Sequence, residues 1–229
     1  MRLNQKEKEI GSYIGRLLRE YFGKGPGAVF AMVADPYITI YIKDFLTPME
    51  HKFLKQDQNF TYVQKNRDML METLIPEITA YIRMNIGVDV KEFYYDWNLH
   101  TLSGMFVAVC SSDYSNLQNS YLNQELVHEE IVKVSEEAEK VPGEVISYLL
   151  NPRTLLIIRK KILVSIEKEL ISLGNQEILT IAKRKLEKRL LEHHKENFEM
   201  YLHARIENAF VAWDFDLDKS GIVFILQPK

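Results

Sequence analysis

Acidic side chains that recur after similar stretches of sequence are the first candidates for chemistry. Glu50 and Glu167 are one such pair, and Asp96 and Asp214 are another. Two carboxylates could act together as a general acid and a general base. No nucleophile or further base accompanies them, so we expect helix capping for Glu50 and turn formation for the two aspartates. The sequence therefore predicts no catalytic residues, and we expect the protein not to be an enzyme.

Histidines are the next candidates, because imidazole is a common metal ligand. No two of them have the HExxH spacing, and the adjacent His193 and His194 must point to different faces of a helix. We expect structural or solvent-facing roles, with His194 beside Phe198 and Leu202 on a buried stripe. The sequence predicts no metal and no cofactor. The six histidines are His51, His100, His128, His193, His194 and His203.

A short glycine-rich segment comprises Gly23, Lys24, Gly25 and Pro26. Its backbone N–H groups and lysine could form a small nest for an anion such as phosphate. It is not a P-loop, since the GxxxxGK[ST] spacing is absent and no helix follows. Glycines often end helices, so a helix end followed by a turn into a strand is the alternative that we favour.

A basic run at residues 182–195, AKRKLEKRLLEHHK, could contact acidic lipid headgroups or an acidic partner. Glu187 and Glu192 interrupt it, and Leu186 and Leu190 are placed to form a core stripe. We therefore expect a solvated helix face. Aromatic residues around Trp97 and Trp213 could likewise form a stacking pocket, but on strands they are more typical of core packing.

Composition excludes several classes of protein. The 229 residues carry a net charge of -3, which argues against a nucleic-acid-binding protein. A single cysteine, Cys110, cannot form an internal disulfide, and on a strand we expect it to be buried. Charged residues interrupt the N-terminal segment, and no apolar run approaches the ~18 residues of a membrane helix. We expect a cytoplasmic protein with no direct membrane span.

Two parts of the chain resemble each other. Residues 26–36 read PGAVFAMVADP and residues 142–152 read PGEVISYLLNP. A second match aligns residues 94–109 with residues 212–226, if one residue is gapped, and pairs Asp96 with Asp214 and Gly104 with Gly221. Several matches in the same order predict a tandem duplication. We place the first copy at residues 1–112, the second at 122–229, and a linker at 113–121.

The first copy has apolar residues at helical spacing near its start, and alternating or β-branched runs further on. Thr47, Pro48 and Glu50 suit an N-cap, a first helical position and a capping box. Pro76 should kink or split the long helix that follows. Asp35 and Pro36 suit a type I turn between the first two strands. We expect an initial helix with Ile10, Ile14, Leu17, Leu18 and Tyr21 on one face, strands at 28–34, 37–43, 88–97 and 105–110, and helices at 48–55 and 61–85.

The second copy repeats this order of elements. Its first helix carries Val127, Ile131, Val134 and Ala138 on one face. We expect strands at 144–150, 154–159, 207–216 and 221–227, and helices at 162–172 and 176–204. The fold class is α+β, with an antiparallel four-stranded sheet covered by helices in each copy. We expect the two copies to pair pseudo-symmetrically, as two subunits of a homodimer do.

The first copy resembles the MpsC family over residues 9–110. The resemblance lies in a Gly-x-Gly-Pro turn, a Leu-Thr-Pro-x-Glu helix start, a following helix with Arg67, and the two closing strands. The second copy resembles a diverged unit of the same family, which keeps Pro142, Gly143 and Glu167 but lacks the paired glycines and the Thr-Pro start. The residues of the two motifs are Gly23, Gly25 and Pro26, then Leu46, Thr47, Pro48 and Glu50.

The resemblance implies a setting for the protein. Members of the family are small bacterial proteins named for a sodium-translocating, membrane-potential-generating system. We expect a non-enzymatic accessory or regulatory protein of a membrane ion or bicarbonate transport system, lying in the cytoplasm or against the inner face of the membrane. Its expected partner is a membrane transport protein, nucleic acid is not expected, and homo-oligomerisation stays open. The alternative is a sensing module that binds a small molecule or anion between the two halves. The candidate binding residues are Gly23, Lys24, Gly25, Pro26, Thr47, Glu50 and Arg67.

Overall fold

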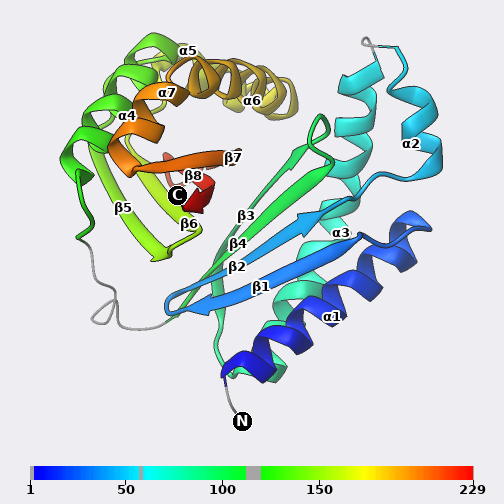
Figure 1. Ribbon diagram of the computed structural model, residues 1–229. Coiled ribbons are helices and arrows are strands. Elements are labelled where there is room, and N and C mark those ends of the chain that lie inside the picture. Colours follow the sequence, from blue (N-terminus) through cyan, green and yellow to red (C-terminus); the bar gives the residue numbers. More distant parts are fainter. Residues whose placement is uncertain (1–2, 57–58, 112–119, 229) are drawn as a thin grey trace. The chain divides into compact units, whose positions relative to one another are not determined.

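The computed structural model describes residues 3–56, 59–111 and 120–228 (Figure 1). The chain divides into two compact units, unit 1 at Met1–Asn116 and unit 2 at Leu117–Lys229. The predicted linker lies outside the described residues, except for residues 120 and 121.

Unit 1 contains a four-stranded antiparallel sheet with the strand order β1-β2-β4-β3. Helices α1 and α3 lie along one face of this sheet (Figure 1). The strand and helix order is the one that the sequence predicted. The elements are α1 (Leu3–Phe22), β1 (Ala28–Ala34), β2 (Tyr37–Lys43), α2 (Pro48–Phe53), α3 (Phe60–Ile86), β3 (Val90–Asn98) and β4 (Ser103–Cys110).

Unit 2 has the corresponding sheet, with the strand order β5-β6-β8-β7, and its strands are again all antiparallel. The predicted α+β class and the tandem arrangement are therefore confirmed. The elements are α4 (Gln124–Ala138), β5 (Glu144–Asn151), β6 (Thr154–Lys160), α5 (Ser165–Ser172), α6 (Gln176–His193), α7 (Lys195–Leu202), β7 (Ala204–Asp214) and β8 (Lys219–Pro228).

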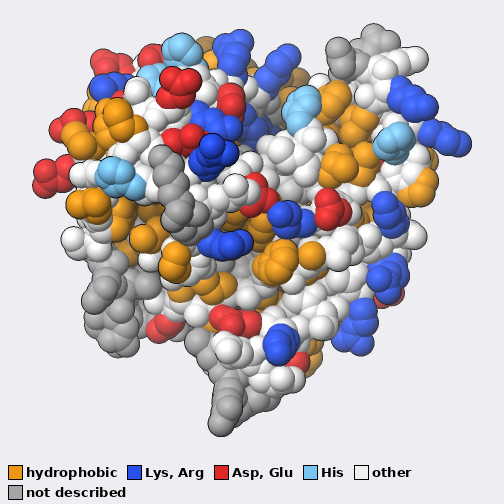
Figure 2. All heavy atoms as spheres, viewed as in Figure 1, with side chains coloured by type: hydrophobic (Ala, Val, Ile, Leu, Met, Phe, Trp, Pro, Cys, Tyr) orange, Lys and Arg blue, Asp and Glu red, His pale blue; other side chains and the backbone are white. Residues whose placement is uncertain are grey.

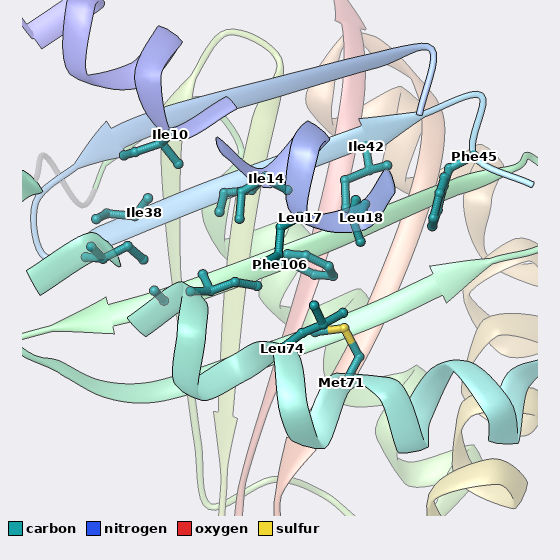
Figure 3. Packing of buried hydrophobic residues seen from close by; sticks show 14 of the residues in the cluster. Ile10, Ile14, Leu17, Leu18, Ile38, Ile42, Phe45, Met71, Leu74 and Phe106 are labelled. Atoms are coloured by element: carbon teal, nitrogen blue, oxygen red, sulfur yellow. The ribbon is translucent and has the colours of Figure 1, made fainter. Parts of the chain in front are cut away.

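The core of unit 1 lies between its two long helices and the sheet (Figure 3). The predicted apolar face of α1 is buried there, and β2 and β4 contribute every second residue, as the two-residue period of a strand requires. Full burial of each such aliphatic side chain stabilises the fold by about 1.5–3 kcal/mol. The cluster includes Ile10, Ile14, Leu17 and Leu18 of α1, Ile38, Ile40 and Ile42 of β2, Met71 and Leu74 of α3, and Phe106 of β4.

The core of unit 2 repeats this plan. Val127, Ile131 and Val134 of α4 are fully buried, as their spacing predicted. They belong to one cluster with Leu155 and Ile157 of β6 and with Ile222 and Phe224 of β8. Each unit therefore has its own hydrophobic centre.

The long helices differ from part of their prediction, because α3 is not split and the long helix of unit 2 is. Pro76 lies inside α3, yet α3 continues without a break from Phe60 to Ile86. The second copy has no proline there, and its expected single helix at 176–204 is instead divided into α6 and α7 at His194. The His194 ring bonds Glu130 and Glu137, two residues of α4, at 2.6 and 3.0 Å. The position of the break therefore coincides with a tertiary contact, which helical spacing does not reveal.

The turn between β1 and β2 also differs. The two-residue loop holds Asp35 and Pro36, but the peptide bond between them is cis. A type I turn has a trans bond at this place, so the predicted turn type is wrong although the hairpin is correct.

Strand register corrects the alignment of the two copies. Trp97 pairs with Gly104 and Trp213 pairs with Ser220, so Ser220 rather than Gly221 corresponds to Gly104. Asp96 lies buried within β3 and is not a turn residue. The counterpart of Asp214 is Asn98, because each begins its turn with a side-chain oxygen that accepts backbone N–H groups. The expected pairing of Asp96 with Asp214 is therefore wrong.

Candidate functional site

The start of α2 is fixed by a capping box. The Thr47 side chain accepts a hydrogen bond from the Glu50 backbone N–H at 3.2 Å, and the Glu50 carboxylate accepts one from the Thr47 N–H at 2.8 Å. Pro48 occupies the first turn of the helix. This arrangement satisfies two of the N–H groups that a helix start leaves free, and it turns the Glu50 side chain inward. The predicted cap is confirmed.

Glu50 forms a buried ion pair with Arg67 of α3. The Arg67 Nε donates to Glu50 Oε1 at 2.7 Å, and Nη2 donates to Oε2 at 2.9 Å and to the Phe45 carbonyl at 3.0 Å. Both side chains are at least nine-tenths buried. Burial alone would raise the pKa of Glu50, but the hydrogen bonds and charge of Arg67 outweigh it and lower that pKa. The pair thus joins the α2 start to α3.

Aromatic rings enclose the Arg67 guanidinium. Its central carbon lies 4.7 Å from the Trp97 ring centroid, 4.8 Å from that of Phe45 and 5.8 Å from that of Phe22. Stacking of this kind suits the flat guanidinium group. Arg67 Nη1 is buried and has no hydrogen-bond acceptor among the described residues. Trp97 of β3 therefore packs in the core, and one Arg67 donor has no acceptor among the described residues.

One residue of the glycine-rich segment, Lys24, lies close to the Glu50–Arg67 ion pair. Lys24 donates from Nζ to the Leu46 carbonyl at 2.9 Å, so its charge is directed at the residue before the Thr47 cap. Gly23 follows α1 with a φ of 74°, in the left-handed region that favours glycine. The side of Gly25 where a Cβ would lie is filled by the Arg19 side chain. These contacts favour a helix end and turn over an anion nest.

A pocket of about 160 Å³ opens next to the ion pair. The structure thus brings Thr47, Glu50 and Arg67 of the candidate residues to one place, with Lys24 close by, whereas Gly23, Gly25 and Pro26 do not line the pocket. Most of the lining is apolar or aromatic. The lining residues are Tyr21, Phe22, Thr47, Met49, Glu50, Phe53, Tyr62, Val63, Asn66, Arg67 and Leu70.

Unit 2 has a modified version of this ion pair. Glu167 takes the place of Glu50 at the start of α5, and Lys183 lies 116 positions after Arg67. Lys183 Nζ donates to Glu167 Oε1 at 2.8 Å, and Glu167 Oε2 accepts the Val164 N–H at 3.0 Å. Val164 has no side-chain acceptor, so only half of the capping box remains.

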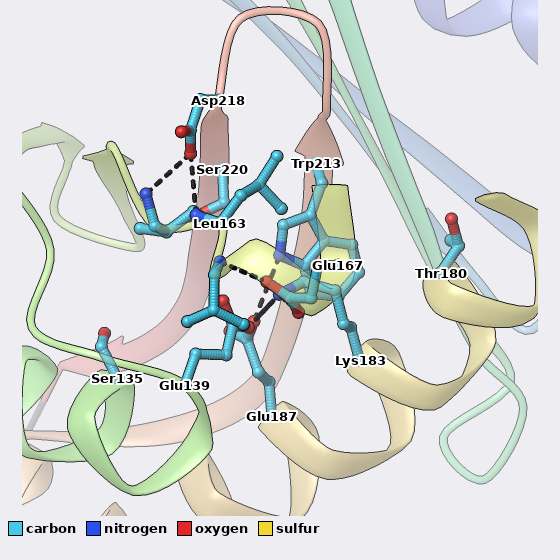
Figure 4. Close-up of polar contacts among 12 residues, drawn as sticks. Ser135, Glu139, Leu163, Glu167, Thr180, Lys183, Glu187, Trp213, Asp218 and Ser220 are labelled. Atoms are coloured by element: carbon cyan, nitrogen blue, oxygen red, sulfur yellow. Dashed lines mark hydrogen bonds and ion pairs between the residues drawn. The ribbon is translucent and has the colours of Figure 1, made fainter. Parts of the chain in front are cut away.

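The pair in unit 2 belongs to a larger buried network (Figure 4). Lys183 also forms an ion pair with Glu139, at the end of α4, and lies 4.0 Å from Glu187 of α6. Glu187 pairs in turn with Arg159 of β6 and accepts the Trp213 indole N–H at 3.1 Å. Arg159 completes its contacts with Ser135 and Ser220, at 3.0 and 2.8 Å. All five charged side chains are at least nine-tenths buried.

This network was not predicted from the sequence. Lys183 and Glu187 were expected in a solvated charge run, with Leu186 and Leu190 on the core stripe. The buried face of α6 instead carries Leu179, Lys183, Arg184, Glu187 and Leu191. The four-residue spacing of Leu179, Lys183, Glu187 and Leu191 was a signal for a shared face that could have been recognised. Leu190 packs partly buried against the core, as expected, but charge type alone placed Lys183 and Glu187 on the wrong face.

A second polar cluster in unit 2 contains a serine and a histidine. His128 Nε2 lies 2.7 Å from Ser147 Oγ, and the Tyr121 hydroxyl lies 2.9 Å from the same atom. Burial lowers the pKa of His128, and burial raises the pKa of Tyr121 to about 12. Ser147 is fully buried, so its hydroxyl is not exposed to a substrate. In the described part of the chain, no group of three or more His, Cys, Asp or Glu side chains could hold a metal ion.

Comparison with known proteins agrees with the two-unit arrangement. A sequence profile of the family described as "Na+-translocating membrane potential-generating system (MpsC)" matches residues 3–112 and again residues 121–228. The chain belongs to the MpsC family. It therefore contains two tandem MpsC units, which agree with the two copies inferred from the sequence.

A relative of this MpsC protein has the length of a single unit. The protein named "Uncharacterized protein YbcI" of Bacillus subtilis (strain 168) is 26% identical over 113 residues, which cover 49% of this chain and 91% of the relative. No solved structure matches the chain. Within the described ranges, no helix is both long and apolar enough to cross a membrane.

Proposed function

We propose that this MpsC protein is a non-enzymatic accessory protein that binds a component of a membrane ion-transport system through an apolar surface of unit 1. We name this surface the α2 patch and define it by Met49, Phe53 and Tyr62, which border the pocket beside Arg67. The family description supports the membrane setting. The observation that carries the proposal is the exposure of the α2 patch.

The side chains of the α2 patch are large and apolar but lie in solvent. Met49 is 64% exposed, Phe53 48% and Tyr62 65%. Single exposed apolar residues are common, but a group around a pocket is typical of an interaction site. In the space-filling view, hydrophobic side chains over the region of α2 are bordered by Lys and Arg side chains (Figure 2). A partner with an apolar protrusion and acidic surroundings would fit this surface.

Unit 2 supports the proposal independently. Ile166 lies 117 positions after Met49 and is 65% exposed, and Ile178 lies 116 positions after Tyr62 and is 62% exposed. The two copies differ in much of their sequence, yet both keep a large apolar residue exposed at these two places. A role in core packing does not explain this exposure, whereas binding of a partner does.

Crosslinking of the tagged protein in its own cells tests the proposal. We expect a membrane transport protein to be enriched from the membrane fraction by the unmodified protein. Phe53→Asp should abolish the enrichment, because it places a charge in the α2 patch. Met84→Asp is the matched control, since Met84 is 78% exposed near the other end of α3. The absence of an enriched membrane protein, or equal loss in both variants, would contradict the proposal.

A second candidate function is the binding of a small molecule in the pocket of unit 1. The unpartnered Arg67 Nη1 supports it, because a ligand with a hydrogen-bond acceptor could satisfy this donor. A thermal-shift screen of small organic acids and amides tests it. A ligand that binds the folded state should raise the melting temperature of the unmodified protein but not that of Met49→Trp, which narrows the pocket. No hit in the screen would count against sensing.

A further inference from the structure

Unit 2 carries one more buried acid than base at its Lys183 network. In the ion pairs of the described chain, the three carboxylates of Glu139, Glu167 and Glu187 share two cations, Lys183 and Arg159. Ionisation of all five groups would leave one negative charge inside the unit. A buried, unbalanced charge is costly, and a carboxyl group avoids the cost by keeping its proton.

Comparison with unit 1 identifies the unbalanced acid. Glu50 and Arg67 form a balanced pair there, as Glu167 and Lys183 would on their own. Unit 2 adds Arg159 and Glu187, which pair with each other and keep the balance. Glu139 is the remaining addition, and Gly23, which is uncharged, lies 116 positions before it. Glu139 is therefore the acid that shares Lys183 with Glu167 and Glu187 and has no cation of its own in this network.

The surroundings of Glu139 point the same way. One of its oxygens bonds Lys183, but Oε2 is buried without a hydrogen-bond partner in the described chain. An ionised carboxylate has charge on both oxygens, so burial of Oε2 without a partner costs more for the ionised group than for the neutral carboxyl. The charged groups facing it are Lys183 and Glu187 on α6 and Glu167 on α5, with Arg159 of β6 behind Glu187. The buried face of α6 also carries Arg184, next to Lys183 in the chain.

We propose that unit 2 contains a proton-binding site at the buried carboxyl of Glu139, where three carboxylates surround Lys183. Burial, followed by the charge of Glu187, raises the pKa of Glu139 to about 7, although Lys183 opposes the shift. The site joins the end of α4 to α6 through Lys183, and a carboxyl with a raised pKa in the folded state makes the stability of the fold depend on pH. This property goes beyond the proposed partner binding and does not depend on it.

The direct test is a titration of the glutamate side-chain carboxyl carbons by 13C NMR on the full, unmodified chain. We expect the assigned Glu139 resonance to titrate near pH 7, well above the ordinary range for glutamate near pH 4.5. Titration of Glu139 in the ordinary range would overturn the proposal. It would also be overturned if Glu167 or Glu187 titrated near neutral pH in its place.

Thermal unfolding gives a second readout. The folded-state pKa of Glu139 lies above its value of 4.5 in the absence of the fold, so its ionisation opposes folding. This contribution to stability is present in full below about pH 4.5 and is lost as the pH rises through about 7. The melting temperature of the unmodified protein should therefore fall by several degrees relative to Glu139→Gln between about pH 5 and about pH 8.

Glu136→Gln is the matched control, because Glu136 is exposed on the same helix. Its melting temperature should parallel that of the unmodified protein across the pH range. Parallel curves for Glu139→Gln would overturn the proposal. The NMR titration decides the question even if Glu139→Gln does not fold, since it requires no variant.

Discussion

Arg67 shows how strongly one side chain can connect separate elements of unit 1. It bonds Glu50 of α2 and the carbonyl of Phe45, and it stacks against the rings around Trp97. Removing one member of a buried ion pair leaves the other charge without compensation, which costs about 3–5 kcal/mol. We expect Arg67→Met to lower the free energy of unfolding by this amount in urea titrations.

Two controls separate burial from charge in this experiment. The exposed pair of Arg83 and Asp89 is 2.5 Å long, and Arg83→Gln should cost less than about 1 kcal/mol. The double variant Glu50→Gln/Arg67→Met should regain part of the loss, because no buried charge remains unpaired. If Arg67→Met and Arg83→Gln lowered the free energy of unfolding equally, the buried pair would contribute no more to stability than the exposed pair.

The glutamates of the two units should respond to pH in opposite directions. The pKa of Glu50 is lowered, so its contribution to stability is present above its unfolded value and is lost as the pH falls through the folded value. Glu139 loses its contribution as the pH rises. The difference follows from charge balance, since Glu50 has a cation of its own and Glu139 shares one.

Gly104 illustrates a requirement for close approach. The Trp97 ring covers the place where a Cβ would lie, at well under 3.0 Å. We expect Gly104→Ala to destabilise the protein by about 1–3 kcal/mol in urea unfolding, because the ring must move. Gly15→Ala is the control, because Gly15 lies within α1 and its added Cβ would lie 3.8 Å from the Val29 side chain, an ordinary contact distance. That variant should gain about 0.5–1 kcal/mol, and a loss equal to that of Gly104→Ala would contradict the explanation.

At the scale of the elements, the starts of α2 and α5 differ in one capping hydrogen bond, because the N-cap residue is Thr47 in α2 and Val164 in α5. Val164 has the extended backbone of an N-cap residue and cannot accept a hydrogen bond through its side chain. Val164→Thr should therefore supply the missing acceptor and raise the free energy of unfolding by about 0.5–1 kcal/mol. Thr47→Val is the reciprocal change and should lower it by about 1 kcal/mol. A loss on Val164→Thr would contradict the equivalence of the two caps.

The elements that were predicted correctly from the sequence are those determined by interactions between residues close together in the chain. The apolar period of Ile10, Ile14 and Leu18 and the turn at Asp35-Pro36 place α1, β1 and β2 correctly, because periodicity and turn residues act within a few positions. The break at His194 was not predictable in this way. It accompanies bonds to Glu130 and Glu137, more than fifty positions earlier in the chain.

The candidate site was predictable only in part. Thr47 and Glu50 were recognised through capping, and Arg67 through the family resemblance. These three residues line one pocket because α2 packs against α3. That tertiary contact cannot be read from local sequence patterns. The Lys183 network was missed because charged residues are expected in solvent, whereas here the charges compensate one another in the interior.

At the scale of the whole molecule, each sheet presents apolar residues on both faces. In unit 1 the helices cover the face of Ile38, Ile40 and Ile42. Tyr37, Tyr41 and Val107 alternate with the core residues and belong to the other face. A sheet with two apolar faces needs a layer on each of them, so we expect unit 1 alone to be incomplete.

This expectation leads to a test by separation of the units. Residues 1–116 produced alone should self-associate, because the face that contains Val107 would otherwise lie in water. Sedimentation velocity would then report a dimer or a larger species. Val107→Lys in the same fragment should shift the population toward monomer, since a buried lysine without a partner is costly. A stable, soluble monomer of the unmodified fragment would show that the helices of unit 1 suffice, and it would contradict this expectation.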